Sequence, residues 1–144
     1  MKSYKHILLA TDFSECSEAA AKRAAELASC FQAKLTLLHV AHYPEYLSDD
    51  WIAPGDVAPS SHLSERAEKA LADLAAQLQL TDISWETVFS TSSTKREIVD
   101  YARENNIDLI VVGTHGRHGL AALLGSVANG VLHGAPCDVL AVRM

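Results

Sequence analysis

The strongest constraint on the fold of this chain is a short apolar run that ends at a glycine, Leu109–Gly113 (LIVVG). Four consecutive aliphatic residues without polar alternation are typical of a strand buried on both faces, as in a parallel sheet. Gly116 and Gly119 follow, and the step Gly125-Ser126 then leads into a helix-like segment. A strand, a glycine loop and a helix start bring backbone N–H groups and a favourable dipole together, which predicts an anion site. The glycines alone are equally compatible with a simple turn after a strand.

Strand-like and helix-like segments alternate along the whole chain. Strands are expected at Ile7–Ala10, Leu35–Val40, Ile83–Phe89, Asp108–Val112 and Asp138–Val142. Helices are expected at Ser14–Cys30, Leu63–Leu80, from Thr94 to near Asn105, and at Ser126–His133. Strands joined by helices form right-handed parallel units, so the alternation predicts an α/β fold with one five-stranded, doubly wound parallel sheet.

Polar residues mark the expected helix starts. Ser14 is the expected N-cap of the first helix, with acidic residues in the turn that follows it. Thr94 and Glu97 match a capping box, and Ser126 is a good N-cap for the last helix.

The segment Ala41–Ser61 lacks periodicity and contains three prolines, so it predicts a long loop. A solvated linker is the favoured interpretation of this loop, and a lid or a partner surface is the alternative.

Composition limits the class of protein. A chain of 144 residues predicts one domain, spanning residues 1–144. The net charge of −6 and the lack of a basic cluster beyond Lys95-Arg96 argue against a nucleic-acid partner. No apolar run approaches the roughly 18 residues of a membrane span, and no secretory signal is recognisable, so we expect a cytoplasmic protein without a membrane partner. The three cysteines lack CxxC spacing, which favours reduced thiols.

The loop sequence resembles that of a known family. Gly113-x-x-Gly116 followed by Gly125-Ser126 is similar to the nucleotide loop of ATP-binding universal stress proteins, and the similarity runs from Tyr4 to Val142. The resemblance implies a Rossmann-like sheet of the adenine nucleotide alpha-hydrolase-like type, with strand order 3-2-1-4-5 and helices on both faces. The segment Arg117–Leu124 is one residue shorter than its family counterpart. We therefore expect AMP or ADP to compete well with ATP.

The resemblance and the sheet topology indicate the same site. In a doubly wound sheet, ligands bind beyond the carboxyl ends of the strands where connections diverge to opposite faces. The resemblance places adenine and ribose against Ala10, Asp12 and Val40. It places the ribose and phosphate side against Val112, Gly113, His115 and Gly116, with Arg117 as a further phosphate ligand. Backbone amides for the phosphates would come from Gly125, Ser126, Val127 and Ala128, and Ser126 would add a hydroxyl.

The remaining motifs favour binding over catalysis. The chain has no P-loop GxxxxGK[ST] and no GxSxG nucleophile motif. His115-x-x-His118 lacks the accompanying ligands of a metal site, so no metal site is expected. The expected function is a homodimeric stress-response sensor or regulator that holds an adenine nucleotide, with Mg²⁺ accompanying ATP, and dimerises through the C-terminal strand Asp138–Met144. The alternatives are a slow nucleotide hydrolase or autophosphorylating enzyme, and an interaction module that binds no nucleotide.

Overall fold

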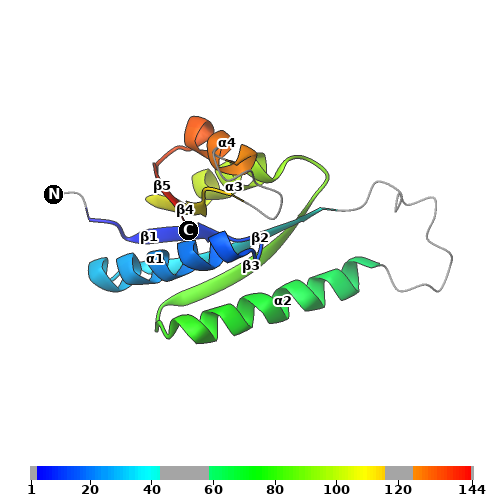
Figure 1. Ribbon diagram of the computed structural model, residues 1–144, viewed down its shortest axis with the longest axis horizontal. Helices are drawn as coiled ribbons and strands as arrows, with labels where there is room; N and C mark the ends of the chain where they lie inside the picture. The colour runs from blue at the N-terminus through cyan, green and yellow to red at the C-terminus, as the bar shows by residue number, and fades with distance from the viewer. Residues whose placement is uncertain (1–2, 43–58, 116–124, 144) are drawn as a thin grey trace.

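A computed structural model describes residues 3–42, 59–115 and 125–143, with residues 59–63 described by their backbone only. Its elements follow one another as strand and helix in strict alternation (Figure 1). They are β1 (His6–Ala10), α1 (Glu15–Phe31), β2 (Lys34–His42), α2 (Pro59–Leu78), β3 (Ile83–Ser90), α3 (Thr94–Glu104), β4 (Leu109–Gly113), α4 (Ser126–Gly134) and β5 (Asp138–Val142). The five strands are all parallel, in the order β3-β2-β1-β4-β5, which confirms the predicted fold class.

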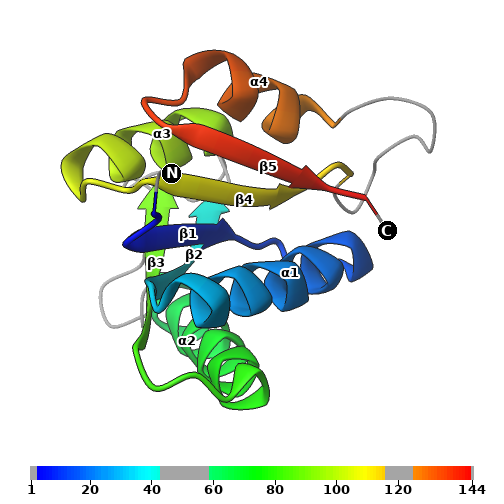
Figure 2. The ribbon, with the colours of Figure 1, turned by 90° about the vertical axis from the view of Figure 1, so that its left-hand side faces the viewer.

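The sheet separates two helical layers. Helices α1 and α2 cover one face, and α3 and α4 cover the other (Figure 2). Because side chains alternate along a strand, Ile7 and Leu9 of β1 face the first layer while Leu8 faces the second. All three are fully buried, as expected for a central parallel strand.

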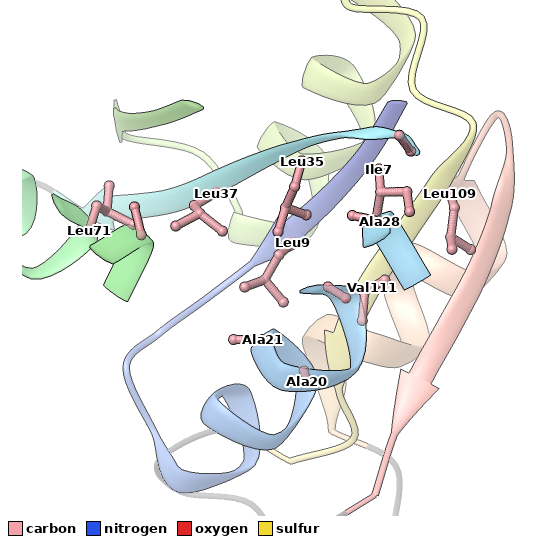
Figure 3. Close-up of a cluster of buried hydrophobic side chains, with 13 residues drawn as sticks. Ile7, Leu9, Ala20, Ala21, Ala28, Leu35, Leu37, Leu71, Leu109 and Val111 are labelled. Carbon is pink, nitrogen blue, oxygen red and sulfur yellow. The ribbon is translucent and has the colours of Figure 1, made fainter. Parts of the chain in front are cut away.

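The first core is built from large strand residues against small helix residues. Ile7, Leu9, Leu35 and Leu37 pack against the alanines of α1 and against Leu71 of α2 (Figure 3). The alanine side chains add little bulk, so the axis of α1 can lie close to the sheet. The second core joins Leu8, Leu38, Ile110 and Val112 to residues of α3 and α4, among them Ile98, Ala102, Ala128 and Val131.

The helix starts confirm one expectation and correct two. Ser14 caps α1, and its side chain accepts a hydrogen bond from Ser17 N. At α3 the cap is Ser93, not Thr94, because the carboxylate of Glu97 accepts hydrogen bonds from serine hydroxyls at the end of β3 instead of turning back to the helix start. At α4 the cap is Gly125, not Ser126.

The expected loop at 41–61 is shorter on both sides. Ala41 and His42 extend β2, and α2 begins at Pro59, a residue suited to the first helical position because it needs no N–H partner there. Residues 43–58 lie outside the described part of the chain, so the linker and lid interpretations both stay open. None of the helices in the described ranges is long and apolar enough to cross a membrane.

Candidate functional site

A pocket of about 310 Å³ opens at the carboxyl ends of β1 and β4. Its walls come from the carboxyl-terminal parts of β1, β2 and β4 and from the amino-terminal parts of α1, α3 and α4. This volume lies at the lower end of the range for small-molecule sites. It is the position at which a doubly wound sheet holds its ligands, because neighbouring connections leave β1 and β4 toward opposite faces.

The predicted site residues meet in this pocket wherever the structure describes them. Those that line it are Ala10, Asp12, Val40, Val112, Gly113, His115, Gly125, Ser126, Val127 and Ala128. Gly116 and Arg117 lie outside the described residues. The fold thus brings together three stretches that are far apart in the sequence.

The corner between β1 and α1 presents Asp12 to the pocket. The Asp12 carboxylate accepts a hydrogen bond from Ser14 N at 3.0 Å, and Thr11 Oγ1 accepts one from Phe13 N at 3.0 Å. Thr11 Oγ1 in turn donates to Ser17 Oγ at 3.0 Å. These bonds fix the backbone of the corner, so the position of Asp12 is set before any ligand binds.

Phe13 adopts a conformation that bulky residues rarely take. Its φ is 62°, in the left-handed region, which costs free energy for a residue with a Cβ atom. The Phe13 ring lies 4.7 Å from the His39 ring, centroid to centroid, and His39 Nδ1 is 2.9 Å from the carbonyl oxygen of Thr11. Packing against His39 therefore offsets the backbone strain and holds the corner that carries Asp12.

The corner between β4 and α4 depends on two glycines that lie in close contact with neighbouring residues. A Cβ atom added at Gly113 would lie 2.9 Å from Cys16 Sγ, so this glycine lets the start of α1 pack against the end of β4. A Cβ atom added at Gly125 would lie 2.8 Å from the carbonyl oxygen of Thr114, which accepts the Gly125 N–H. The strand end and the helix start consequently touch, and only glycine fits at their contact.

The N-terminus of α4 faces the pocket. Ser126, Val127 and Ala128 form its first turn, and the N-cap Gly125 supplies no side-chain hydrogen bond to it. The first N–H groups of a helix have no partner within the helix, and its dipole favours negative charge there. This wall of the pocket is suited to an anionic group.

His115 contributes a buried nitrogen to the same wall. Its Nδ1 lies 2.9 Å from Thr114 Oγ1, while its Nε2 is buried without a hydrogen-bond partner in the described structure. Buried polar atoms of folded proteins nearly always have a partner. Nε2 thus keeps a hydrogen-bonding capacity that no described group uses.

Sequence reasoning missed several residues of the lining. These are Thr11, Ser17, Leu38, Thr94, Ile98 and Thr114. Thr11 and Thr114 follow the ends of β1 and β4 directly, so their positions could have indicated them. Thr94 and Ile98 carry no such signal, because only the packing of α3 over the sheet brings them to the pocket. Thr94 Oγ1 lies 2.6 Å from His42 Nε2 at the end of β2.

The pocket's described lining contains one carboxylate, one imidazole and several hydroxyls, but no lysine or arginine. Within the described ranges, no group of three or more His, Cys, Asp and Glu residues could hold a metal ion. Together these groups can hydrogen-bond a polar ligand and hold an anion at the helix start.

The fold and the position of the pocket define a doubly wound, Rossmann-like domain with a pocket at its strand ends. The chain matches the Universal stress protein family over residues 3–143, and it belongs to this family. Universal stress protein A homolog 1 of Coxiella burnetii is 42% identical over 142 residues, which cover 98% of this chain and 97% of the relative.

Two solved structures extend the comparison. Universal stress protein UspA from Lactobacillus plantarum superposes with a TM-score of 0.76 at 28% identity, covering 99% of this chain and 100% of that chain. A universal stress protein crystallised in complex with cAMP gives a TM-score of 0.70 at 27% identity, with 98% of each chain covered.

Proposed function

We propose that the protein binds an adenine nucleotide in the strand-end pocket and acts as a cytoplasmic, homodimeric stress-response sensor or regulator. The distribution of chemistry within the pocket carries this proposal. Leu38, Val40 and Ile98 supply an apolar wall, Asp12 supplies a carboxylate, and the start of α4 supplies helix N–H groups. A purine, a ribose and a phosphate offer an apolar face, hydroxyl groups and negative charge. Each part of a nucleotide therefore has a matching wall.

Each predicted residue has a role in this proposal. Ala10 and Val40 contact the base, and the Asp12 carboxylate accepts hydrogen bonds from ribose hydroxyls or from an amino group. The phosphates are bound by backbone amides at Gly125–Ala128 and by the Ser126 hydroxyl. Val112, Gly113 and His115 line the side between ribose and phosphate, and Gly116 and Arg117 complete the phosphate site.

The proposal also concerns how many phosphates the bound nucleotide carries. A relative at 27% identity was crystallised with cAMP, which supports an adenine nucleotide as the class of ligand. The short segment between Gly116 and Gly125 leads us to expect AMP and ADP to compete well with ATP. When ATP binds, we expect Mg²⁺ to accompany it.

The proposed dimer forms through β5. This strand is at the edge of the sheet, and its residues from Val139 to Val142 are only partly buried. An exposed edge strand carries unpaired backbone groups that invite pairing with another chain. Antiparallel pairing of two β5 strands about a twofold axis would close the assembly. Light scattering should report a dimer at micromolar concentration, and deletion of the last strand should yield monomers.

We expect the protein to hold its nucleotide far better than it hydrolyses it. Phosphoryl transfer requires positive charge at the transferred oxygens and a group that positions water. The described lining offers helix N–H groups and His115 for these tasks, without a lysine. Turnover should be much slower than the roughly 1–1000 per second of ordinary enzymes. Rapid phosphate release from ATP that His115→Ala abolishes would make this protein an enzyme.

The nucleotide released on denaturation tests the proposal most simply. Purified protein is denatured, and the supernatant is analysed by mass spectrometry for purine and pyrimidine nucleotides. We expect an adenine nucleotide near one per chain from the wild type and much less from Asp12→Ala. Failure of the wild type to carry or to bind any adenine nucleotide would favour the interaction-module alternative.

A further inference from the structure

The unpartnered Nε2 of His115 raises the question of which ring nitrogen carries the proton. The ring lines the pocket, and Nε2 has no partner in the described part of the chain. Its other nitrogen, Nδ1, lies 2.9 Å from Thr114 Oγ1. The state of Nδ1 decides whether Nε2 presents a proton or a lone pair to a ligand.

The surroundings of Thr114 favour one direction for that hydrogen bond. Cys16 donates its thiol proton to the carbonyl oxygen of Val142 at 3.5 Å. The Thr114 hydroxyl is buried and has two acceptors in reach, His115 Nδ1 at 2.9 Å and Cys16 Sγ at 3.8 Å. An imidazole nitrogen is a far better acceptor than a thiol sulfur, and it is also nearer. Donation from the Thr114 hydroxyl to Nδ1 is therefore the favoured arrangement, and it leaves the proton of the ring on Nε2.

The backbone places His115 beside the start of α4. The carbonyl of Thr114 accepts the Gly125 N–H, and a Cβ atom added at Gly125 would lie 3.5 Å from His115 Cα. The His115 ring and the first turn of α4 therefore belong to one wall of the pocket. The first N–H groups of a helix have no acceptor within that helix, and together with Nε2–H they form the set of donors that an anionic oxygen requires.

We propose that Thr114 is a positioning residue, which fixes the tautomer and orientation of His115 so that Nε2–H donates to a phosphate oxygen of the bound nucleotide. This inference rests on the proposed nucleotide binding and adds to it a phosphate ligand and the residue that orients it. The pair gives the site a preference for a phosphorylated nucleotide over the parent nucleoside.

The chain contains a matched control pair at the other end of the sheet. Thr36 is buried like Thr114, and its Oγ1 lies 2.8 Å from a histidine nitrogen, His6 Nε2. Neither of these two residues lines the pocket. Thr36→Val thus removes a buried threonine–histidine hydrogen bond without touching the proposed site.

The test compares AMP with adenosine by calorimetry for the wild type, Thr114→Val, Thr114→Ser and Thr36→Val. We expect Thr114→Val to lose about tenfold in AMP affinity, as for one charge-assisted hydrogen bond, with adenosine affinity unchanged. Thr114→Ser keeps the hydroxyl and should keep the preference for AMP, and so should Thr36→Val. A folded Thr114→Val variant with the wild-type ratio of AMP to adenosine affinity would overturn the positioning role while nucleotide binding stands. A wild type that binds neither compound would contradict the proposed function itself.

Nitrogen-15 NMR of the ligand-free wild type tests the same inference without a ligand and without a variant. We expect the His115 signals of a neutral ring protonated at Nε2, because Nδ1 accepts from Thr114. A neutral ring protonated at Nδ1 would overturn the inference, since Nε2 would then offer a lone pair that repels a phosphate.

Discussion

The two ends of the sheet each hold a buried threonine bonded to a histidine, and they use the pair differently. At the amino end, His6 Nε2 bonds Thr36 Oγ1 at 2.8 Å, and Thr36 Oγ1 lies 3.0 Å from Ser84 Oγ. At the carboxyl end, Thr114 bonds one nitrogen of His115 and the other nitrogen is left without a partner among described residues. The first arrangement links three strands, whereas the second leaves hydrogen-bonding capacity unused on a residue that lines a pocket.

A pair of carboxylates repeats this contrast. Asp108 accepts hydrogen bonds from the backbone N–H groups of Lys5 at 2.8 Å and His6 at 2.9 Å, and so joins the start of β1 to the start of β4. Asp12 accepts from Ser14 N at 3.0 Å and also lines the pocket. The comparison teaches that similar residue types join strands at one end of the sheet and line a pocket at the other.

Gly125→Ala should produce the largest effect on recognition. The new Cβ atom would meet the Thr114 carbonyl oxygen at 2.8 Å, so the start of α4 must move away from the pocket wall. Losing helix N–H bonds to a phosphate at about 1.5–3 kcal/mol should weaken AMP binding roughly 10- to 100-fold. Calorimetry with AMP measures the change.

Gly134→Ala is the matched control for this substitution. Its Cβ atom would lie 3.4 Å from a Val99 methyl group, an ordinary contact, at the opposite end of the same helix. We expect AMP affinity to stay within about twofold of the wild type. Equal losses in the two variants would mean that α4 acts through its stability and not through its N-terminus.

Substitutions of Asp108 and Asp12 should affect stability and nucleotide binding separately. Asp108→Ala leaves two backbone N–H groups without their acceptor and should lower the free energy of unfolding by about 1–3 kcal/mol, with AMP affinity unchanged. Asp12→Ala should weaken AMP binding about tenfold and cost less stability. Urea unfolding and calorimetry on both variants decide this, and a loss of AMP affinity in Asp108→Ala would break the comparison between the two ends.

The sequence predicts the fold well because its strands are short aliphatic runs that are easy to recognise. The aliphatic run at Leu109 has no amphipathic alternative, and the strand and helix assignments followed from such runs and from helical spacing. Helix starts were less predictable, since several hydroxyls compete at each one. Ser93 caps α3 because the Glu97 side chain bonds Ser90 and Ser92, and no local pattern shows that preference.

The candidate site was predictable where it follows strand ends and the glycine loop. Thr114 follows the end of β4 directly, so its position could be inferred from the sequence but its hydrogen bonds could not. Those bonds involve Cys16 and Val142, which lie far away in the sequence and reach Thr114 only through the packing of α1 and β5. Thr94 was missed because it begins helix α3, and only the packing of that helix over the sheet brings it next to His42 at the end of β2.

The smallest predicted effect is a pH dependence that originates at the amino end. Burial, and secondarily the charge of Lys34, lowers the pKa of His6 below its usual 6.5. Below that pH the unfolded chain binds the proton more readily than the folded chain does, so stability falls as the pH drops through 6.5 toward the folded pKa. Thermal unfolding from pH 7.5 to 5 should show a shallower loss of stability in His6→Gln than in the wild type.

His133→Gln serves as the control for that measurement, because His133 is exposed on α4. Its profile of melting temperature against pH should follow that of the wild type. A His6→Gln profile identical to the wild type would show that His6 is not the group whose protonation opposes folding.

The division of the sheet into a cohesive end and a recognition end is tested most directly by an NMR titration of the full chain with AMP. We predict large amide shifts for Ala10–Asp12, Gly113–His115 and Ser126–Ala128, and unchanged amides at Lys5, Thr36 and Asp108. Saturating AMP that leaves the pocket amides unmoved, or that shifts the amino-end amides as strongly, would contradict the assignment of this pocket as a nucleotide site.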